Sequence, residues 1–265
     1  MKKKLYQYNK HPPAKKGKKV KVRVTSNVTL DEEISKVYGM HGDLSTTCLR
    51  QCHCCRVACP QMNYSEAISI IDYIWNNWEK KDKAKILTTA IKYFFSKSLI
   101  KPCPMLSDNN CLVYERRPLS CRLYGLWPQD AYEKRVSVVS EALKMPKEQI
   151  PLNVQCSFVK RKNGSPLSID EINGMYEALD KIDFHLLLKE DLTKQDEISQ
   201  KIKKKWHYRT IHDWLLFVFL GEDWLVKLTS FSMASTKEAL DDFIVVLERD
   251  VVPKLLEEKI HGGKR

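Results

Sequence analysis

The chain has 265 residues, of which 43% are hydrophobic, enough for one or two domains with an apolar core. It has nine glycines and neither a G-x-G-x-x-G nor a G-x-x-x-x-G-K-S/T pattern, which disfavours a glycine-rich nucleotide-binding loop. The net charge is +12, but nine lysines and one arginine within residues 1–24 supply +10 of it, so the rest carries only about +2. The basicity therefore belongs to the N-terminal tail and not to the folded body.

The chain begins with a segment that we expect to be disordered. Residues 1–24 are polar and contain the consecutive prolines Pro12 and Pro13, and only residues 20–24 alternate as a short strand or extended arm would. The tail lacks the apolar stretch of a signal peptide, and the longest apolar run, residues 214–220, is too short to span a membrane. We therefore expect a cytoplasmic protein without a transmembrane segment.

Three helices are predicted before residue 100. The first is short and begins near Thr29, with acidic residues near its positive end. The second opens at Asn63, which has Glu66 at capping-box spacing, and the third runs from about Lys83 with apolar residues on one stripe. Because a short link joins these two helices and Pro102 follows the second of them, we expect a helical hairpin between two groups of cysteines.

The second half of the chain is expected to be helical apart from two loops. Residues 101–128 are rich in Pro, Asn and Cys, and residues 151–165 form the other loop. Helices are predicted over residues 130–145, 168–189, from about 195, over 207–220, and from 235 onward with a kink at Pro253. The predicted fold class is mainly α, a helical domain with irregular cysteine-rich metal-binding loops.

Cysteine is the most informative residue type in this chain. The nine candidate metal ligands are Cys48, Cys52, Cys54, Cys55, Cys59, Cys103, Cys111, Cys121 and Cys156. A disulfide framework is typical of small secreted chains, and merely buried cysteines have no reason to cluster. Thiolates are soft ligands that suit zinc, copper(I) and iron–sulfur clusters. The clustering therefore predicts a metal centre, in which the adjacent Cys54 and Cys55 are better suited to two roles than to one ion.

The cysteine spacing does not choose the metal. A 4Fe–4S cluster takes four thiolates, or three and an open iron, whereas structural zinc takes four Cys or His ligands. The chain has neither the ferredoxin spacing nor a pair of Cys-x2-Cys knuckles. Residues 45–60 and 101–125 contain few large aliphatic residues, so we expect metal binding to order both loops.

Several other residues have two interpretations. Arg117 and Arg122 offer guanidinium donors that would lower the cost of excess thiolate charge, or they only help to fix a turn. His53 lies between two cysteines, but we expect it and the other histidines, including His212, to be surface or core residues rather than ligands. The basic tail and the basic run at residues 201–205 could contact nucleic acid, although solvated segments are the commoner case.

The downstream cysteines stand in a pattern that resembles a known family. The chain reads Cys-Pro-x-Leu and then Cys-x-x-Tyr-x-x-Arg-Pro-x-x-Cys-Arg, which is similar to the YkgJ-type cysteine-cluster family, described as a zinc- or iron-chelating domain. The matching residues are Cys103, Pro104, Leu106, Cys111, Tyr114, Arg117, Pro118, Cys121 and Arg122. Upstream the family has Cys-x2-Cys-x2-Cys-Cys, whereas this chain has Cys-x3-Cys-x-Cys-Cys from residue 48. The resemblance covers about residues 45–160.

The resemblance implies a metal-binding function. Flagellin lysine N-methylase has a similar cysteine domain that is associated with an iron–sulfur cluster, which favours that cofactor over zinc. We therefore predict a cytoplasmic metal-binding protein whose thiolates ligate an iron–sulfur cluster or zinc, and which acts with a protein partner or protein substrate. One alternative is an iron–sulfur-dependent enzyme that modifies a protein side chain by methyl transfer. Another is a zinc-stabilised module that binds nucleic acid through the basic tail.

The expected organisation has three parts. Residues 1–24 form the basic tail, residues 25–165 the cysteine-cluster metal-binding domain, and residues 166–265 a helical C-terminal region. The chain has no recognisable Ser-His-Asp triad, H-E-x-x-H motif or paired carboxylates. The sequence therefore identifies no catalytic residue.

Overall fold

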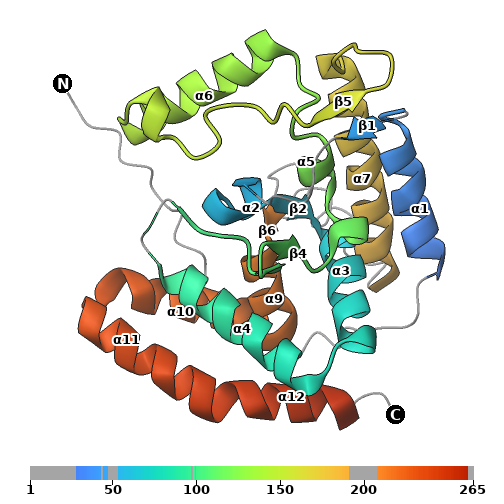
Figure 1. Cartoon of the computed structure of the whole chain (residues 1–265). Coiled ribbons are helices and arrows are strands. Elements are labelled where there is room, and N and C mark those ends of the chain that lie inside the picture. The colour runs from blue at the N-terminus through green and yellow to red at the C-terminus, as the bar shows by residue number, and fades with distance from the viewer. Residues whose placement is uncertain are drawn as a thin grey trace.

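A computed structural model describes residues 28–42, 44–46, 53–96, 98, 100–190 and 208–261. The predicted tail, Cys48, Cys52, the helix from about residue 195 and the basic run at 201–205 lie outside these residues. The described part is mainly helical, as predicted, with a few short strands (Figure 1). Its helices include none that is long and apolar enough to cross a membrane.

The elements follow one another along the chain as helices with short strands between them. The helices are α1 (Val28–Gly39), α2 (His53–Val57), α3 (Tyr64–Asn77), α4 (Lys80–Phe95), α5 (Leu119–Arg122), α6 (Gln129–Leu143), α7 (Ile169–Glu190), α9 (Ile211–Leu220), α10 (Glu222–Ala234), α11 (Lys237–Val246) and α12 (Val252–His261). The 3-10 turns η1 (Tyr114–Arg116) and η2 (Lys147–Gln149) and the π turn η4 (Leu247–Val251) complete the helical elements. The strands pair antiparallel as β1 (Leu44–Thr46) with β5 (Val159–Arg161), β2 (Gln61–Asn63) with β6 (Tyr208–Thr210), and β3 (Leu106–Ser107) with β4 (Asn110–Cys111).

The core forms where α3 and α4 pack on α9. Helix α9 is apolar on nearly all sides, and Trp214 and Leu215 are fully buried in it. The sequence predicts that α3 and α4 form a hairpin, but they diverge and α9 lies between them (Figure 1). The reason is the link, in which Trp78 and Glu79 both have extended backbone and set the second helix at an angle to the first.

Elements on both sides of residue 165 share one core. Helices α1 and α3 pack on α7, α4 packs on α9, α11 and α12, and β1 pairs with β5. The buried apolar residues of all these helices belong to a single cluster. Because helices from both sides contribute to this core, the contacts do not mark a domain boundary at residue 165. The division into residues 25–165 and 166–265 stays a prediction.

Local capping chemistry places several helix starts where the sequence predicts them. Before α3, the Glu66 carboxylate accepts a hydrogen bond from the N–H of Asn63 at 3.0 Å. Before α7, the N–H of Ser168 donates to the Glu171 carboxylate, and the N–H of Glu171 donates to the Ser168 hydroxyl. Helix α10 is not among the predicted elements, and α11 starts after Thr236, one residue later than expected. The kink predicted at Pro253 stays a prediction, although a π turn, η4, ends two residues before this proline, which has no N–H to donate.

Candidate metal centre

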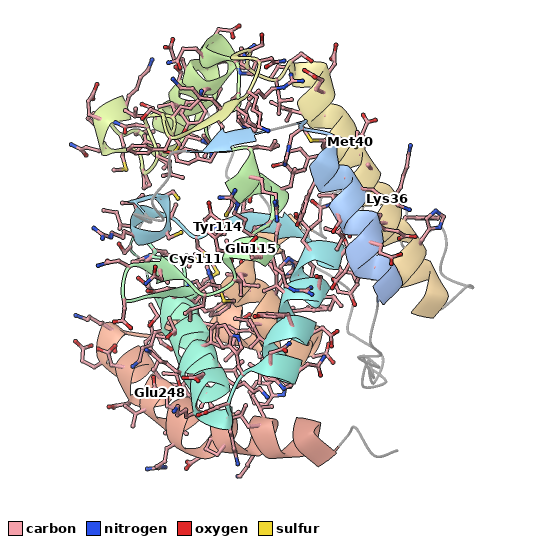
Figure 2. All side chains as sticks on the ribbon, turned by 45° about the vertical axis from the view of Figure 1, so that its right-hand side comes forward. Lys36, Met40, Cys111, Tyr114, Glu115 and Glu248 are labelled. Atoms are coloured by element: carbon pink, nitrogen blue, oxygen red, sulfur yellow. The ribbon has the colours of Figure 1, made fainter. Side chains whose placement is uncertain are left out.

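A β-hairpin positions one of the candidate ligands. The sequence predicts an irregular segment over residues 101–128, but β3 and β4 pair there with Leu106 opposite Cys111. The turn residues Asp108 and Asn109 have φ values of +46° and +61°, in the left-handed region that Asp and Asn tolerate best after glycine. The hairpin therefore holds Cys111 at a fixed register, at the middle of the molecule in Figure 2.

The downstream cysteine segment, residues 101–122, is anchored in the core by apolar side chains. Met105, Val113 and Leu119 are at most 5% exposed. Leu119 also donates its N–H to the buried carboxylate of Glu66 at 2.6 Å, which ties α5 to α3. This segment therefore has an apolar framework of its own, and the expectation that metal binding orders both loops stays a prediction.

The upstream cysteine segment, of which residues 53–60 are described, lies against this framework without burying a side chain of its own. None of residues 54–60 is buried. The N–H of Cys103 donates to the carbonyl oxygen of Cys55 at 2.6 Å, and the guanidinium of Arg56 donates to Asn109 at 2.7 Å. The two groups of cysteines are thus joined directly, although many residues separate them in the sequence.

Cys54, Cys55 and Cys111 form the first thiol group. The Sγ atoms of Cys54 and Cys55 are 4.0 Å apart, and the Cys55 thiol also interacts with Cys111. Hydrogen bonding from Cys55 lowers the pKa of both Cys54 and Cys111 to about 7, and the positive charge of Arg117 acts in the same direction. The pKa of Cys55 is raised, because it is the donor to Cys111 and Cys54. The hydrogen bonds from Cys55 and the charge of Arg117 therefore both favour the thiolate form of Cys54 and Cys111.

Cys121 lies within electrostatic range of the first thiol group. Burial raises its pKa, and negative charge on Cys54 and Cys111 raises it further, whereas Arg117 lowers it. Cys121 follows Pro118 at the start of α5, where its N–H donates to the Pro118 carbonyl oxygen at 2.9 Å. Helix α5 therefore carries a fourth thiol to this region.

The two arginines of the motif have different surroundings. Arg117 lowers the pKa of the thiols around it, and its guanidinium lies 4.3 Å from the ring centre of Tyr114. Arg122 donates to the carbonyl oxygens of Arg117 at 2.9 Å and Glu115 at 2.6 Å, and it stacks on Tyr38. Arg117 is therefore placed to balance thiolate charge, while Arg122 fixes the turn.

Cys59 and Cys103 form the second thiol group. Cys59 lies just before β2, and β2 pairs with β6, the strand that leads into α9. Hydrogen bonding from Cys103 lowers the pKa of Cys59 to about 6 against the effect of burial, and His212 and the N–H of Ile211 lower it further. A thiolate is stabilised by such an N–H at the start of a helix.

Cys156 lies on the loop before β5, against a glycine. A Cβ atom on Gly125 would lie 2.6 Å from the carbonyl oxygen of Cys156, and the φ of Gly125 is +116°, so this close approach requires glycine. Burial raises the pKa of Tyr124, and the Cys54 and Cys156 thiols add to this rise. Cys156 and Cys54 therefore both act on Tyr124, but Cys156 is not placed in either thiol group.

The structure brings six of the nine predicted ligands into two thiol groups. Cys54, Cys55, Cys111 and Cys121 belong to one, and Cys59 and Cys103 to the other. Cys48 and Cys52 lie outside the described residues. Within the described part of the chain, no three His, Cys, Asp or Glu side chains already stand as a set that could hold a metal ion. The donor chemistry suits a soft metal, but the side chains would have to close on it.

Sequence reasoning missed His212 as a member of this region. It lies far from the cysteines along the chain, on a helix whose pattern indicates only burial. Only the pairing of β2 with β6 reveals its position beside Cys59. Comparison of the chain with protein-family models, curated proteins and solved structures finds no match.

Proposed function

We propose that this protein binds a metal cofactor, an iron–sulfur cluster or zinc, through its cysteine thiolates. The observation that carries the proposal is the gathering of six thiols from two distant segments around the Cys103–Cys55 backbone hydrogen bond. The 4.0 Å between the Sγ atoms of Cys54 and Cys55 supports it. Two thiolates on one tetrahedral zinc, with bonds of about 2.3 Å, lie about 3.8 Å apart.

The acidity of the thiols also supports metal binding. A metal takes the thiolate, so a thiol of ordinary pKa must lose a proton at a cost when it binds near neutral pH. The pKa is lowered to about 7 for Cys54 and Cys111 and to about 6 for Cys59. These three thiols therefore offer thiolates near neutral pH, whereas Cys55, Cys103 and Cys121, whose pKa values are raised, must release a proton when a metal binds. Arg117 offsets part of the excess negative charge.

The resemblance of residues 103–122 to the YkgJ-type pattern points to the same chemistry. It favours an iron–sulfur cluster, for which four thiolates, or three and an open position, suffice. The residues that would hold the cofactor are Cys54, Cys55, Cys111 and Cys121 in one group, and Cys59 and Cys103 in the other. When bound, the cofactor would link the upstream segment to the anchored downstream one.

The direct experiment is anaerobic purification followed by measurement of iron, zinc and acid-labile sulfide per chain. Iron with matching sulfide would identify a cluster, and zinc without sulfide a zinc site. The double variant Cys55→Ser/Cys111→Ser should lose metal, whereas Ser137→Ala on α6, far from the motif, should keep the wild-type content. A wild-type chain that holds no stoichiometric metal, even after reconstitution, would refute the proposal.

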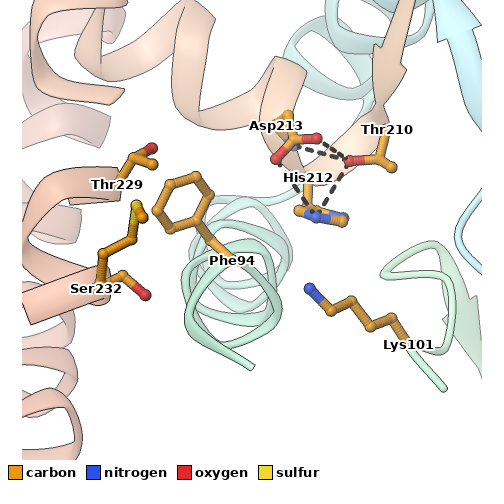
Figure 3. A pocket seen from close by; sticks show the side chains of 8 residues that line it. Phe94, Lys101, Thr210, His212, Asp213, Thr229 and Ser232 are labelled. Atoms are coloured by element: carbon orange, nitrogen blue, oxygen red, sulfur yellow. Dashed lines mark hydrogen bonds and ion pairs between the residues drawn. The ribbon is translucent and has the colours of Figure 1, made fainter. Parts of the chain in front are cut away.

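A second candidate function is enzymatic modification of a protein side chain, and one observation favours it. His212, which contacts Cys59, also lines a surface pocket of about 350 Å³ together with Phe94, Lys101, Thr210, Asp213 and Ser232 among others (Figure 3). A purely structural metal site is closed and needs no neighbouring pocket, whereas a reactive one does.

The methyl-transfer form of this candidate can be tested by ligand binding. Labelled S-adenosylmethionine, as methyl donor, should bind the metal-loaded chain in equilibrium dialysis. The variant Ser232→Trp, which fills the pocket, should abolish this binding, and Ser137→Trp on α6 should not. Binding that is absent, or that survives Ser232→Trp, would argue against a methyl-donor site in this pocket.

A further inference from the structure

The register of the β2–β6 pair brings a histidine to the second thiol group. Gln61 lies opposite Thr210 in this antiparallel pair. The pairing ends there, with Cys59 two residues before Gln61 and His212 two residues after Thr210, in the first turn of α9. The Cys59 thiol interacts with this histidine. Two residues that are remote in sequence are therefore neighbours because of a three-residue strand pairing.

A tyrosine confirms that the thiols and the histidine share one neighbourhood. The ring of Tyr93 on α4 meets the ring of His212 edge-on, with 6.4 Å between their centres. Burial raises the pKa of the same tyrosine, and Cys103 and Cys59 raise it further. Cys59, Cys103 and His212 thus all lie around one side chain.

His212 is buried with one ring nitrogen unpartnered. It is only 4% exposed. Its Nε2 atom lies 3.1 Å from Oγ1 of Thr210 and 3.4 Å from Oδ1 of Asp213 (Figure 3). Its Nδ1 atom is buried and has no hydrogen-bond partner in the described part of the chain. Leaving such a polar atom unpaired costs about 1–3 kcal/mol, so a histidine that served only to fill the core would be expected to have a partner there.

The hydroxyl of Thr210, held by Asp213, decides which nitrogen of the His212 ring is available. The Thr210 hydroxyl donates to Oδ2 of Asp213, so it accepts an N–H from Nε2 of His212, which leaves Nδ1 as the unprotonated nitrogen with its lone pair free. Metal-binding histidines are oriented by an oxygen acceptor on the nitrogen that does not bind, and here the carboxylate of Asp213 acts on the ring through the Thr210 hydroxyl. Asp213 and Thr210 therefore hold His212 in the tautomer that a metal ligand requires.

We propose that His212 is a nitrogen ligand that completes a metal site with Cys59 and Cys103, and that Asp213 is its positioning residue. The inference rests on the proposed function, because it requires that the thiols bind metal. It divides the described donors into a sulfur-only group and a mixed group of two thiolates and one imidazole. Three protein ligands are the number found at zinc sites that keep an open position. Since no such set is preassembled among the described residues, the three side chains must close on the ion when it binds.

The test is an anaerobic titration of the metal-free, reduced full-length chain with Co²⁺, whose visible spectrum reports its ligands. In His212→Gln, the amide keeps a polar group near Thr210 and Asp213 but offers nothing at the Nδ1 position. We expect this variant to bind one ion fewer per chain, or to bind that ion at least about 100-fold more weakly. His185→Ala, an exposed histidine on α7, is the matched control and should titrate as wild type does.

Two further variants separate a ligand from a structural residue. His212→Cys supplies a thiolate in place of the imidazole, so it should restore the ion and increase the sulfur-to-cobalt charge-transfer absorption. Asp213→Ala should weaken the same ion by about 10–100-fold and leave the other ion unchanged. Far-UV circular dichroism should be unchanged in both variants.

The outcomes distinguish this inference from the proposed function. If the wild-type chain binds Co²⁺ and His212→Gln binds it with the same stoichiometry, affinity and spectrum, the histidine is not a ligand and the cysteine centre stands. If His212→Gln loses an ion that His212→Cys does not restore, the histidine is structural and the inference is wrong. If the wild-type chain binds no Co²⁺, iron or zinc, both proposals fail.

Discussion

The two cysteine segments carry the same kind of side chain but are held in different ways. In the downstream segment, Met105 and Leu119 are buried in the core, and a hairpin fixes the register of Cys111. In the upstream segment, none of residues 54–60 is buried, and the contacts with the downstream segment include one backbone hydrogen bond and one side-chain hydrogen bond. The downstream segment is therefore anchored in the core, and the upstream segment packs against it.

This difference in burial indicates which of the two segments depends on the cofactor for its stability. Burial of apolar surface contributes about 25 cal/mol per Å², so the downstream segment is stabilised by the core whether or not metal is bound. The upstream segment has less of that source of stability, since only partly buried side chains such as Cys55 and Cys59 pack against the core, and it can gain more from ligand bonds to an ion. We therefore expect the upstream segment to depend on metal binding more than the downstream one.

Removal of metal should have the largest effect, and it should be unequal. In the metal-free chain, amide hydrogen exchange over residues 53–60 should accelerate by at least about 100-fold, because none of residues 54–60 is buried and ligand bonds would supply much of the stability of this segment. Residues 119–126 should change by no more than about threefold, since Leu119, Leu123 and Leu126 are buried. Hydrogen exchange measured by mass spectrometry would check this. Equal acceleration in both segments would mean that the downstream framework also depends on metal.

Truncation of one apolar side chain should destabilise the protein more in the downstream segment than in the upstream one, which is the opposite of the order expected for metal removal. Leu119→Ala removes a fully buried side chain and should lower the free energy of unfolding by about 2–5 kcal/mol. Val57→Ala in α2 removes a partly exposed one and should cost less than about 1 kcal/mol. Urea denaturation of the metal-free chain measures both. Similar costs at the two positions would contradict the asymmetry.

Glu66 gives the framework a pH dependence. It accepts hydrogen bonds from Tyr38, Asn63 and Leu119, but burial raises its pKa to about 7. The folded chain therefore keeps a proton that the unfolded chain releases near its ordinary pKa of 4.5. The free energy of unfolding should then fall by about 1–3 kcal/mol as the pH rises through that interval.

The comparison that isolates this carboxyl uses two matched variants. Glu66→Gln cannot ionise, so the fall in stability between pH 5 and about 7 should become smaller than in the wild type. Glu33→Gln, an exposed acid on α1, should retain the wild-type dependence. Urea denaturation across this pH range is the measurement. A wild-type pH dependence in Glu66→Gln would show that another group is responsible.

The smallest expected effect concerns Arg117. It lowers the pKa of Cys54 and Cys111 after the larger contribution of Cys55, so Arg117→Gln should raise both values. Alkylation of these thiols in the metal-free chain at pH 7 should then slow by about twofold to threefold, because less thiolate is present. Arg116→Gln is the control, since Arg116 pairs with Asp31 at 2.6 Å. Equal rates in all three proteins would remove Arg117 from the electrostatics of the site.

Local patterns in the sequence by themselves determined most of the helices. Capping boxes mark the starts of α3 and α7 because Glu66 and Glu171 satisfy backbone donors within their own turn. Clustering of cysteine likewise identified the region of the candidate site, although two of its members lie outside the described residues. The hairpin at Asp108 and Asn109 was missed, because two-residue strands have too few positions for an alternating pattern.

Tertiary structure alone decided how the site is assembled. The divergence of α3 and α4 around α9, the burial of Leu119 and the approach of His212 to Cys59 all depend on contacts between residues far apart in the sequence. The separate roles of Arg117 and Arg122 arise in the same way, because each is defined by what packs against it. Local residue spacing decides which backbone N–H groups find a hydrogen-bond acceptor within their own segment, and so where helices begin. The neighbours of a thiol or an imidazole are instead set by how segments far apart in the sequence pack in the core.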